Sequence, residues 1–129
     1  MKILFDTHAF IWFLNGDKNF ASETLSLIAD KNNAVYISAA SYWEICIKIS
    51  IGKLSLAENW SRIISDQISL NRISWLDIKE EHLDASVSLP WHHRDPFDRL
   101  LAAQSLTEEC LFCTSDEIFT SYGLEIIRC

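Results

Sequence analysis

Residues 92–104 read His-His-Arg-Asp-Pro-Phe-Asp-Arg-Leu-Leu-Ala-Ala-Gln and contain the clearest helix start in this chain of 129 residues. Asp95 suits the N-cap position, and Pro96 suits the first helical position because it has no N–H to leave unpaired there. Asp98 then falls in the first turn, and the helix is expected to continue through Leu106. Such a sharp start places the Asp98 carboxylate at the amino-terminal end of a helix.

Strands and helices are predicted to alternate on both sides of this segment. The predicted strands lie at residues 2–6, 34–38, 73–78, 110–115 and 124–128. The predicted helices lie at residues 9–14, 22–32, 38–51, 60–68, 79–88 and 95–106, with a short helical turn ending near 122–123. This alternation is typical of an α/β fold with a parallel sheet covered by helices on both faces. The length and the 49% hydrophobic content favour a single domain over residues 1–129.

The net charge of −7 argues against a protein that coats nucleic acid without specificity, because that mode of binding needs a basic face. Two interpretations remain. Either the chain does not contact nucleic acid, or its carboxylates are concentrated around a bound cation that reverses the local charge.

No feature of the chain indicates export or membrane insertion. The apolar stretch 3–14 is interrupted by Asp6 and His8 and has no basic leader, so we expect neither a signal peptide nor a membrane span. A soluble, cytoplasmic protein is the expectation. The four cysteines are then expected to be reduced thiols, with Cys110 and Cys113 packing in the core rather than binding metal.

Four acidic residues are predicted to meet at one edge of the sheet. Asp6 and Asp116 follow the first and the fourth predicted strands. Glu44 lies early in a strongly apolar helix after the second strand, and Asp98 lies at its helix start. Sites in open parallel sheets form at the carboxyl ends of strands, where the strand order reverses. Each acid alone also has an ordinary explanation, as a helix cap, a turn residue or, for Glu44, the ion-pair partner of Lys48.

Taken together, the four acids predict a metal centre. Carboxylates that are gathered within a few ångströms repel one another and lower stability unless a cation compensates. Ligands that are all oxygen favour Mg²⁺ or Mn²⁺ over zinc. Such an ion can activate a water for attack on a phosphate and stabilise the leaving oxygen. A small metal-dependent nuclease is therefore the interpretation favoured by the residues themselves.

Several neighbouring residues are candidates for contacts with the acids or the substrate. Arg94, Arg99, Lys48 and Lys53 are the basic residues expected to flank the acids and contact phosphates. His92 or His93 could face the substrate, and Asp95 is expected to act as a cap rather than as a fifth ligand.

Four segments of this sequence resemble a known family, the PIN-domain nucleases, and within it the VapC-like toxins of prokaryotic type II toxin–antitoxin systems. They are Leu-Phe-Asp-Thr-His (4–8), Ser-Ala-Ala-Ser-Tyr-Trp-Glu-Ile (38–45) with Lys48 and Gly52-Lys53-Leu54, the stretch 92–104, and Thr-Ser-Asp (114–116). The stretch 92–104 is the most specific of the four, because it is long and unlike a generic helix start. The resemblance extends over essentially the whole chain.

The resemblance implies a PIN domain with a five-stranded parallel sheet between helices. It implies that Mg²⁺ or Mn²⁺ is held by Asp6, Glu44, Asp98 and Asp116. The residues implied to lie around these ligands or to face the substrate are Asp95, Thr7, Thr114, Ser115, Arg94, Arg99, Lys48 and His93. It also implies an endoribonuclease that cleaves structured RNA such as tRNA, forms a homodimer and is inhibited by a cognate antitoxin protein.

Two other interpretations stay open at this stage. The same carboxylates could serve a metal-dependent phosphatase or a structure-selective DNA nuclease. The chain could also be a noncatalytic module that binds a partner, with its acids acting only as caps. Exposed aromatic residues such as Trp60, Trp75 or Trp91 could anchor a dimer or an antitoxin.

Overall fold

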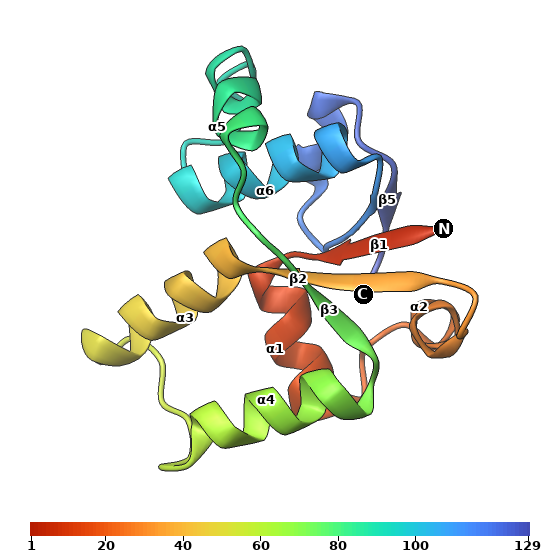
Figure 1. Ribbon diagram of the computed structural model, residues 1–129, viewed down its shortest axis with the longest axis vertical. Coiled ribbons are helices and arrows are strands. Elements are labelled where there is room, and N and C mark those ends of the chain that lie inside the picture. The colour runs from red at the N-terminus through yellow and green to blue at the C-terminus, as the bar shows by residue number, and fades with distance from the viewer.

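A five-stranded sheet lies at the centre of the computed structural model, which describes residues 1–129 (Figure 1). Its strands are β1 (Lys2–Phe5), β2 (Ala34–Ser38), β3 (Ile73–Leu76), β4 (Leu111–Cys113) and β5 (Ile126–Ile127). All neighbouring strands are parallel, in the order β3-β2-β1-β4-β5. The predicted α/β class with a five-stranded parallel sheet is therefore confirmed.

The strand order reverses between β1 and β4. From β1 the chain moves outward to β2 and β3, and it then returns to the other side of β1 to form β4 and β5. Phe5 is in register with Cys113, so these two strands end side by side. The residues that follow them, Asp6 and Thr114, consequently lie at the position where parallel sheets form their sites.

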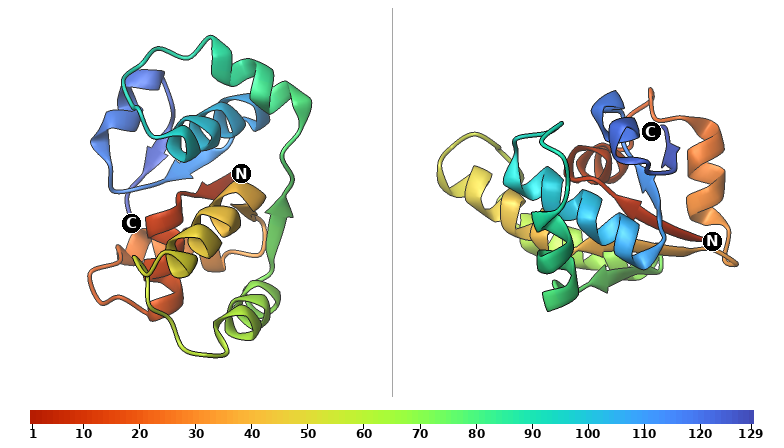
Figure 2. Two further views of the ribbon diagram at one scale, coloured as in Figure 1. Left: turned by 90° about the vertical axis from the view of Figure 1, so that its left-hand side faces the viewer. Right: turned by 90° about the horizontal axis from the view of Figure 1, so that it is seen from above.

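Helices cover both faces of the sheet (Figures 1 and 2). They are α1 (Thr7–Asn15), α2 (Ser22–Ala29), α3 (Ala39–Ser50), α4 (Trp60–Leu70), α5 (Glu80–Val87) and α6 (Pro96–Glu108), together with the 3₁₀ helix η1 (Glu117–Tyr122). Consecutive strand residues point to opposite faces, so Ile3 and Phe5 pack with α1, α2 and α4, whereas Leu4 packs with α6 and η1. Two apolar layers thus enclose the sheet.

The ends of several helices and strands differ from the predicted ends, and local hydrogen bonds account for the differences at α1 and α2. α1 begins at Thr7, two residues earlier than predicted, because Asp6 caps it. α2 ends at Ala29 rather than near residue 32, because Asp30 is extended and its carboxylate accepts the Asn32 N–H in a turn. The strands predicted over 110–115 and 124–128 are shorter in the structure, as β4 and β5, which pair with each other only at Phe112 with Ile126 and at Cys113 with Ile127.

The cysteines are free thiols, and Cys110 and Cys113 are buried in the core, as predicted. None of the helices has both the length and the apolar composition that a membrane span requires.

Candidate metal centre

Asp6 is the first acid of the centre and is held by two hydrogen bonds. Its Oδ1 accepts the Ala9 N–H at 2.6 Å, and its Oδ2 accepts a hydrogen bond from the Thr114 hydroxyl. Burial raises the pKa of the Asp6 carboxyl, although the hydrogen bonds from Thr114 and Ala9 oppose that rise. The carboxylate is therefore oriented at the end of β1 and is costly to keep ionised without a cation.

Glu44 is held from two sides within the second turn of α3. The Thr7 hydroxyl donates to its Oε1 at 2.6 Å, and the Lys48 ammonium lies 2.9 Å from its Oε2. The ion pair considered in the sequence is present, but it does not lie on a solvated face, because Glu44 is only 5% exposed. Lys48 thus compensates a carboxylate and is not a free contact for phosphate.

His93 joins the two remaining acids. Its Nε2 lies 3.0 Å from Asp98 Oδ2 and 3.4 Å from Asp116 Oδ2. Its Nδ1 accepts the Asp95 N–H at 3.1 Å, so the ring hydrogen of the neutral imidazole is on Nε2 and faces the carboxylates. His93 was predicted to face the substrate, and in the structure its ring contacts two of the acids.

Burial and repulsion from neighbouring acids both act on the Asp98 carboxyl and raise its pKa. Burial is the largest cause that raises the pKa of its carboxyl to about 7. Repulsion from nearby carboxylates adds to the rise, and these belong to Asp95, Glu44, Asp6 and Asp116. The structure therefore brings the four predicted acids together, and each comes from a different part of the chain.

Asp95 and Asp116 are both helix caps, with different consequences. Asp95 accepts the N–H groups of Phe97 and Asp98 through one oxygen, which confirms the prediction that it caps α6. Asp116 accepts the Ile118 N–H at 3.1 Å through Oδ1, which leaves Oδ2 toward the cluster. A capping role therefore does not remove Asp116 from the site.

Thr114 connects two of the acids through one hydroxyl. It donates to Asp6 and accepts the N–H of Asp116 at 3.0 Å. Thr114 is fully buried, so this geometry is fixed by the core beneath it.

Comparison with known sequences identifies the family. The PIN domain profile matches residues 3–124. This chain belongs to the PIN-domain family. Members of that family are nucleases, in agreement with a carboxylate cluster at the strand ends. No curated protein matches the chain.

Solved structures share the fold of this PIN domain at low sequence identity. VapBC2 from Rickettsia felis, bound to a DNA fragment from its promoter, has a TM-score of 0.77 at 20% identity, over 99% of this chain and 98% of that one. VapBC-1 from nontypeable Haemophilus influenzae has a TM-score of 0.75 at 18% identity, over the same shares. A toxin–antitoxin complex from Klebsiella pneumoniae has a TM-score of 0.64 at 17% identity, over 97% and 95%.

Arg99 does not flank the acids of this PIN domain, and its predicted phosphate contact is wrong. Its guanidinium is buried and donates to the carbonyl oxygens of Pro90, Ser86 and Leu89 at 2.9–3.2 Å. It also lies 3.7 Å from the ring centroid of Trp91. Carbonyl groups at the end of a helix lack intrahelical partners, and Arg99 donates to carbonyls in the last turn of α5 and just after it.

The other residues predicted to flank the acids make no ion pair or hydrogen bond with them in the structure. Arg94 and Lys53 are exposed and form no ion pair in the structure. Ser115 is exposed. A hydrogen bond with Cys113 is the main cause that lowers the pKa of the Cys129 thiol, and a hydrogen bond with Ser115 lowers it to a smaller extent. The ring of His92 meets that of Tyr122 edge to face and does not contact the acids.

The donor set of the PIN domain fits a hard divalent cation. All four clustered acids offer only carboxylate oxygens, and every buried polar side-chain atom of the protein has a hydrogen-bond partner. Oxygen ligands of this kind suit Mg²⁺ or Mn²⁺. A separate group, Glu81, His82 and Glu108, has ligand atoms that all lie within 4.8 Å of one another, a spacing that no three of the four clustered acids reach. Ten residues of α6, about 15 Å, separate Glu108 from Asp98, so that group is distinct from the carboxylate cluster.

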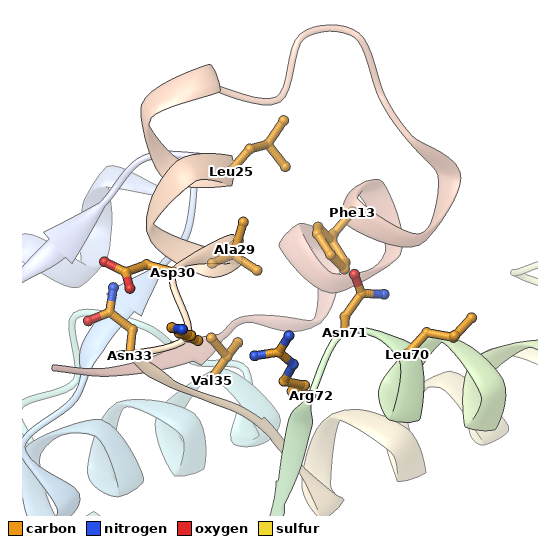
Figure 3. Close-up of a pocket in the computed structure, with 11 residues that line it drawn as sticks. Phe13, Leu25, Ala29, Asp30, Asn33, Val35, Leu70, Asn71 and Arg72 are labelled. Atoms are coloured by element: carbon orange, nitrogen blue, oxygen red, sulfur yellow. The ribbon is translucent and has the colours of Figure 1, made fainter.

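The largest pocket of the molecule is not part of this centre. It has a volume of about 520 Å³ and lies among α1, α2 and the end of α4, at the amino ends of β2 and β3 (Figure 3). Val35 and Arg72 line it at the starts of those strands. The carboxylate cluster lies at the opposite ends of the strands.

Proposed function

We propose that this PIN domain is a metal-dependent endoribonuclease and the toxin of a type II toxin–antitoxin system. The observation that carries the proposal is the gathering of Asp6, Glu44, Asp98 and Asp116 around the reversal of the strand order. Only Lys48 forms an ion pair with one of these four acids, and the neutral ring of His93 donates its N–H toward two others. A divalent cation is the natural compensation for the remaining negative charge.

The residues of the chain would hold and orient the ion. We propose Asp6, Glu44, Asp98 and Asp116 as its ligands. When bound, Mg²⁺ or Mn²⁺ supplies an activated water and stabilises the leaving oxygen of the phosphodiester. Thr7 and Thr114 hold Glu44 and Asp6, respectively, through hydroxyl donors, and His93 holds the other two acids. These hydrogen bonds keep the ligands in place before the ion arrives.

The partners are part of the proposal. Likeness in fold to VapBC structures and to a toxin–antitoxin complex supports a cognate antitoxin that inhibits the domain. We further propose that the protein acts in the cytoplasm as a homodimer on RNA. Expression of the chain should arrest growth, and co-expression of a small open reading frame adjacent to its gene should relieve that arrest.

The decisive experiment compares cleavage of RNA by the purified wild type and by Asp6→Asn and Asp98→Asn, with Mg²⁺, Mn²⁺ or EDTA. Each substitution is expected to lower the rate by more than about 100-fold, which exceeds the usual effect of losing an outer hydrogen-bond partner. Asp66→Asn is the matched control, because Asp66 is an exposed acid on α4.

Full cleavage by either site variant would overturn the ligand assignment. Cleavage of a phosphomonoester or of flap DNA without any cleavage of RNA would overturn the proposed substrate. Sequencing the 5′ ends of RNAs after induction of wild type and of Asp98→Asn would identify the target.

A further inference from the structure

Two aromatic side chains meet between α3 and α6, the helices that carry Glu44 and Asp98. Trp43 directly precedes Glu44, and Phe97 directly precedes Asp98. The two rings meet edge to face, with their centroids 5.4 Å apart. Trp43 is 61% exposed, so much of its indole ring is open to solvent. The contact between the two rings therefore joins the helix turns that carry Glu44 and Asp98, although neighbouring side chains of a helix project about 100° apart.

Positive charge is scarce around the same carboxylates. Lys48 is paired with one of them, and the guanidinium of Arg99 is buried beside α5. His93 directs its ring N–H at two further acids. Of the basic residues predicted to flank the site, Arg94 and Lys53 alone are exposed and unpaired. Few positively charged side chains are therefore available here to bind the phosphates of a nucleic acid strand.

Base stacking supplies affinity without positive charge. An aromatic ring can stack on any unpaired base, whereas a base inside a duplex already has neighbours on both faces. The edge-to-face contact with Phe97 restrains the Trp43 indole, which remains 61% exposed.

We propose that Trp43, supported by Phe97, is a stacking platform for an unpaired base of a nucleic acid strand whose phosphodiester lies at the carboxylates. The inference rests on the proposed nuclease function and assigns a residue that binds its substrate. The base that stacks on the ring must be unpaired. Trp43 is then a substrate-binding residue, and Phe97 is a positioning residue.

The test measures binding separately from cleavage. Full-length protein carrying Asp98→Asn is titrated with Mg²⁺ present against three fluorescein-labelled probes: a short single-stranded RNA, the same RNA with abasic positions at its centre, and the corresponding duplex. Trp43→Ala, Trp43→Phe and Phe97→Leu are compared in this background. Trp91→Ala is the matched control, because Trp91 is 72% exposed and contacts Arg99 rather than the site.

Trp43→Ala is expected to weaken binding of the intact single strand by about 5- to 100-fold, the range for loss of one stacked base. Binding of the abasic strand and of the duplex should change by less than about twofold, since neither offers a free base to the ring. Trp43→Phe should retain most of the affinity, and Phe97→Leu should lose part of it. Trp91→Ala should bind like the parent.

Each other outcome has a defined meaning. Equal weakening on intact and abasic strands, or no weakening at all, would overturn the stacking platform while leaving the nuclease assignment intact. Loss of a dimer by Trp43→Ala in size-exclusion chromatography, with base dependence unchanged, would assign the ring to self-association. Base-dependent binding in a wild type that cleaves no RNA would retain the platform and overturn the proposed function. Absence of RNA binding by the parent would overturn both.

Discussion

At the residue scale, single polar atoms decide which acids can act together. The Thr114 hydroxyl both donates to Asp6 and accepts from the Asp116 backbone, and it is completely buried. The Nε2–H of His93 performs a similar task for Asp98 and Asp116. Each atom therefore couples carboxylates that are far apart in sequence.

Replacement of Thr114 by valine tests this coupling. The substitution keeps the side-chain shape but removes the donor to Asp6, so we expect a drop of about 10- to 100-fold in metal affinity and in RNA cleavage. Thr114→Ser retains a hydroxyl and should recover most of both. Mn²⁺ titration and cleavage assays give the two readouts. Unchanged Mn²⁺ affinity in Thr114→Val would show that this hydroxyl does not prepare the ligand.

At the element scale, a buried polar contact joins the helices that carry Glu44 and Asp98. The Ser38 hydroxyl accepts the Ala40 N–H at the start of α3 and donates to Gln104 Oε1 of α6 at 2.6 Å. Both side chains are fully buried. This contact ties the amino-terminal end of α3 to the middle of α6, across which the two proposed ligands must meet.

Gln104→Leu and Ser38→Ala test this connection. Each should lower the free energy of unfolding by about 1–3 kcal/mol, because each leaves a buried polar group without its partner. The double variant should be less destabilised than the sum of the two, because both changes remove the same contact. Urea unfolding of the four proteins measures the coupling. Strict additivity would show that Ser38 and Gln104 act independently.

At the scale of the whole molecule, the fold gathers negative charge in a protein that is already acidic. The folded state raises the pKa of Asp98 to about 7, chiefly through burial, from the ordinary value of 3.8. Between these two pH values the folded protein holds a proton that the unfolded chain has lost. The free energy of unfolding of the metal-free protein should therefore fall as pH rises from about 4 to 7.

Thermal unfolding in EDTA from pH 5 to pH 8 measures this effect. The melting temperature of the wild type should fall by several degrees, and that of Asp98→Asn should fall less, because its amide does not titrate. Mg²⁺ should restore stability most strongly at pH 8, where the ligands are ionised. An identical pH slope in Asp98→Asn would contradict the assignment of the proton to Asp98.

The sequence by itself determined the elements and the identity of the four acids. Asp95 and Pro96 define the start of α6 through hydrogen bonding and backbone geometry that are local to a few residues. The alternation of apolar strands with helices likewise determined the parallel sheet, because strands joined by helical crossovers must run parallel.

Only the tertiary structure decided what surrounds the acids. Arg99 follows Asp98 directly, yet its side chain leaves the helix about 100° away and donates to carbonyl groups in the last turn of α5 and just after it. The Ser38–Gln104 contact and the exposure of Trp43 also gave no signal in the sequence. Hydrogen bonds and burial of this kind depend on which elements pack together across long sequence separations. A local pattern of residues therefore predicts a helix cap or a strand, but it does not predict these long-range contacts.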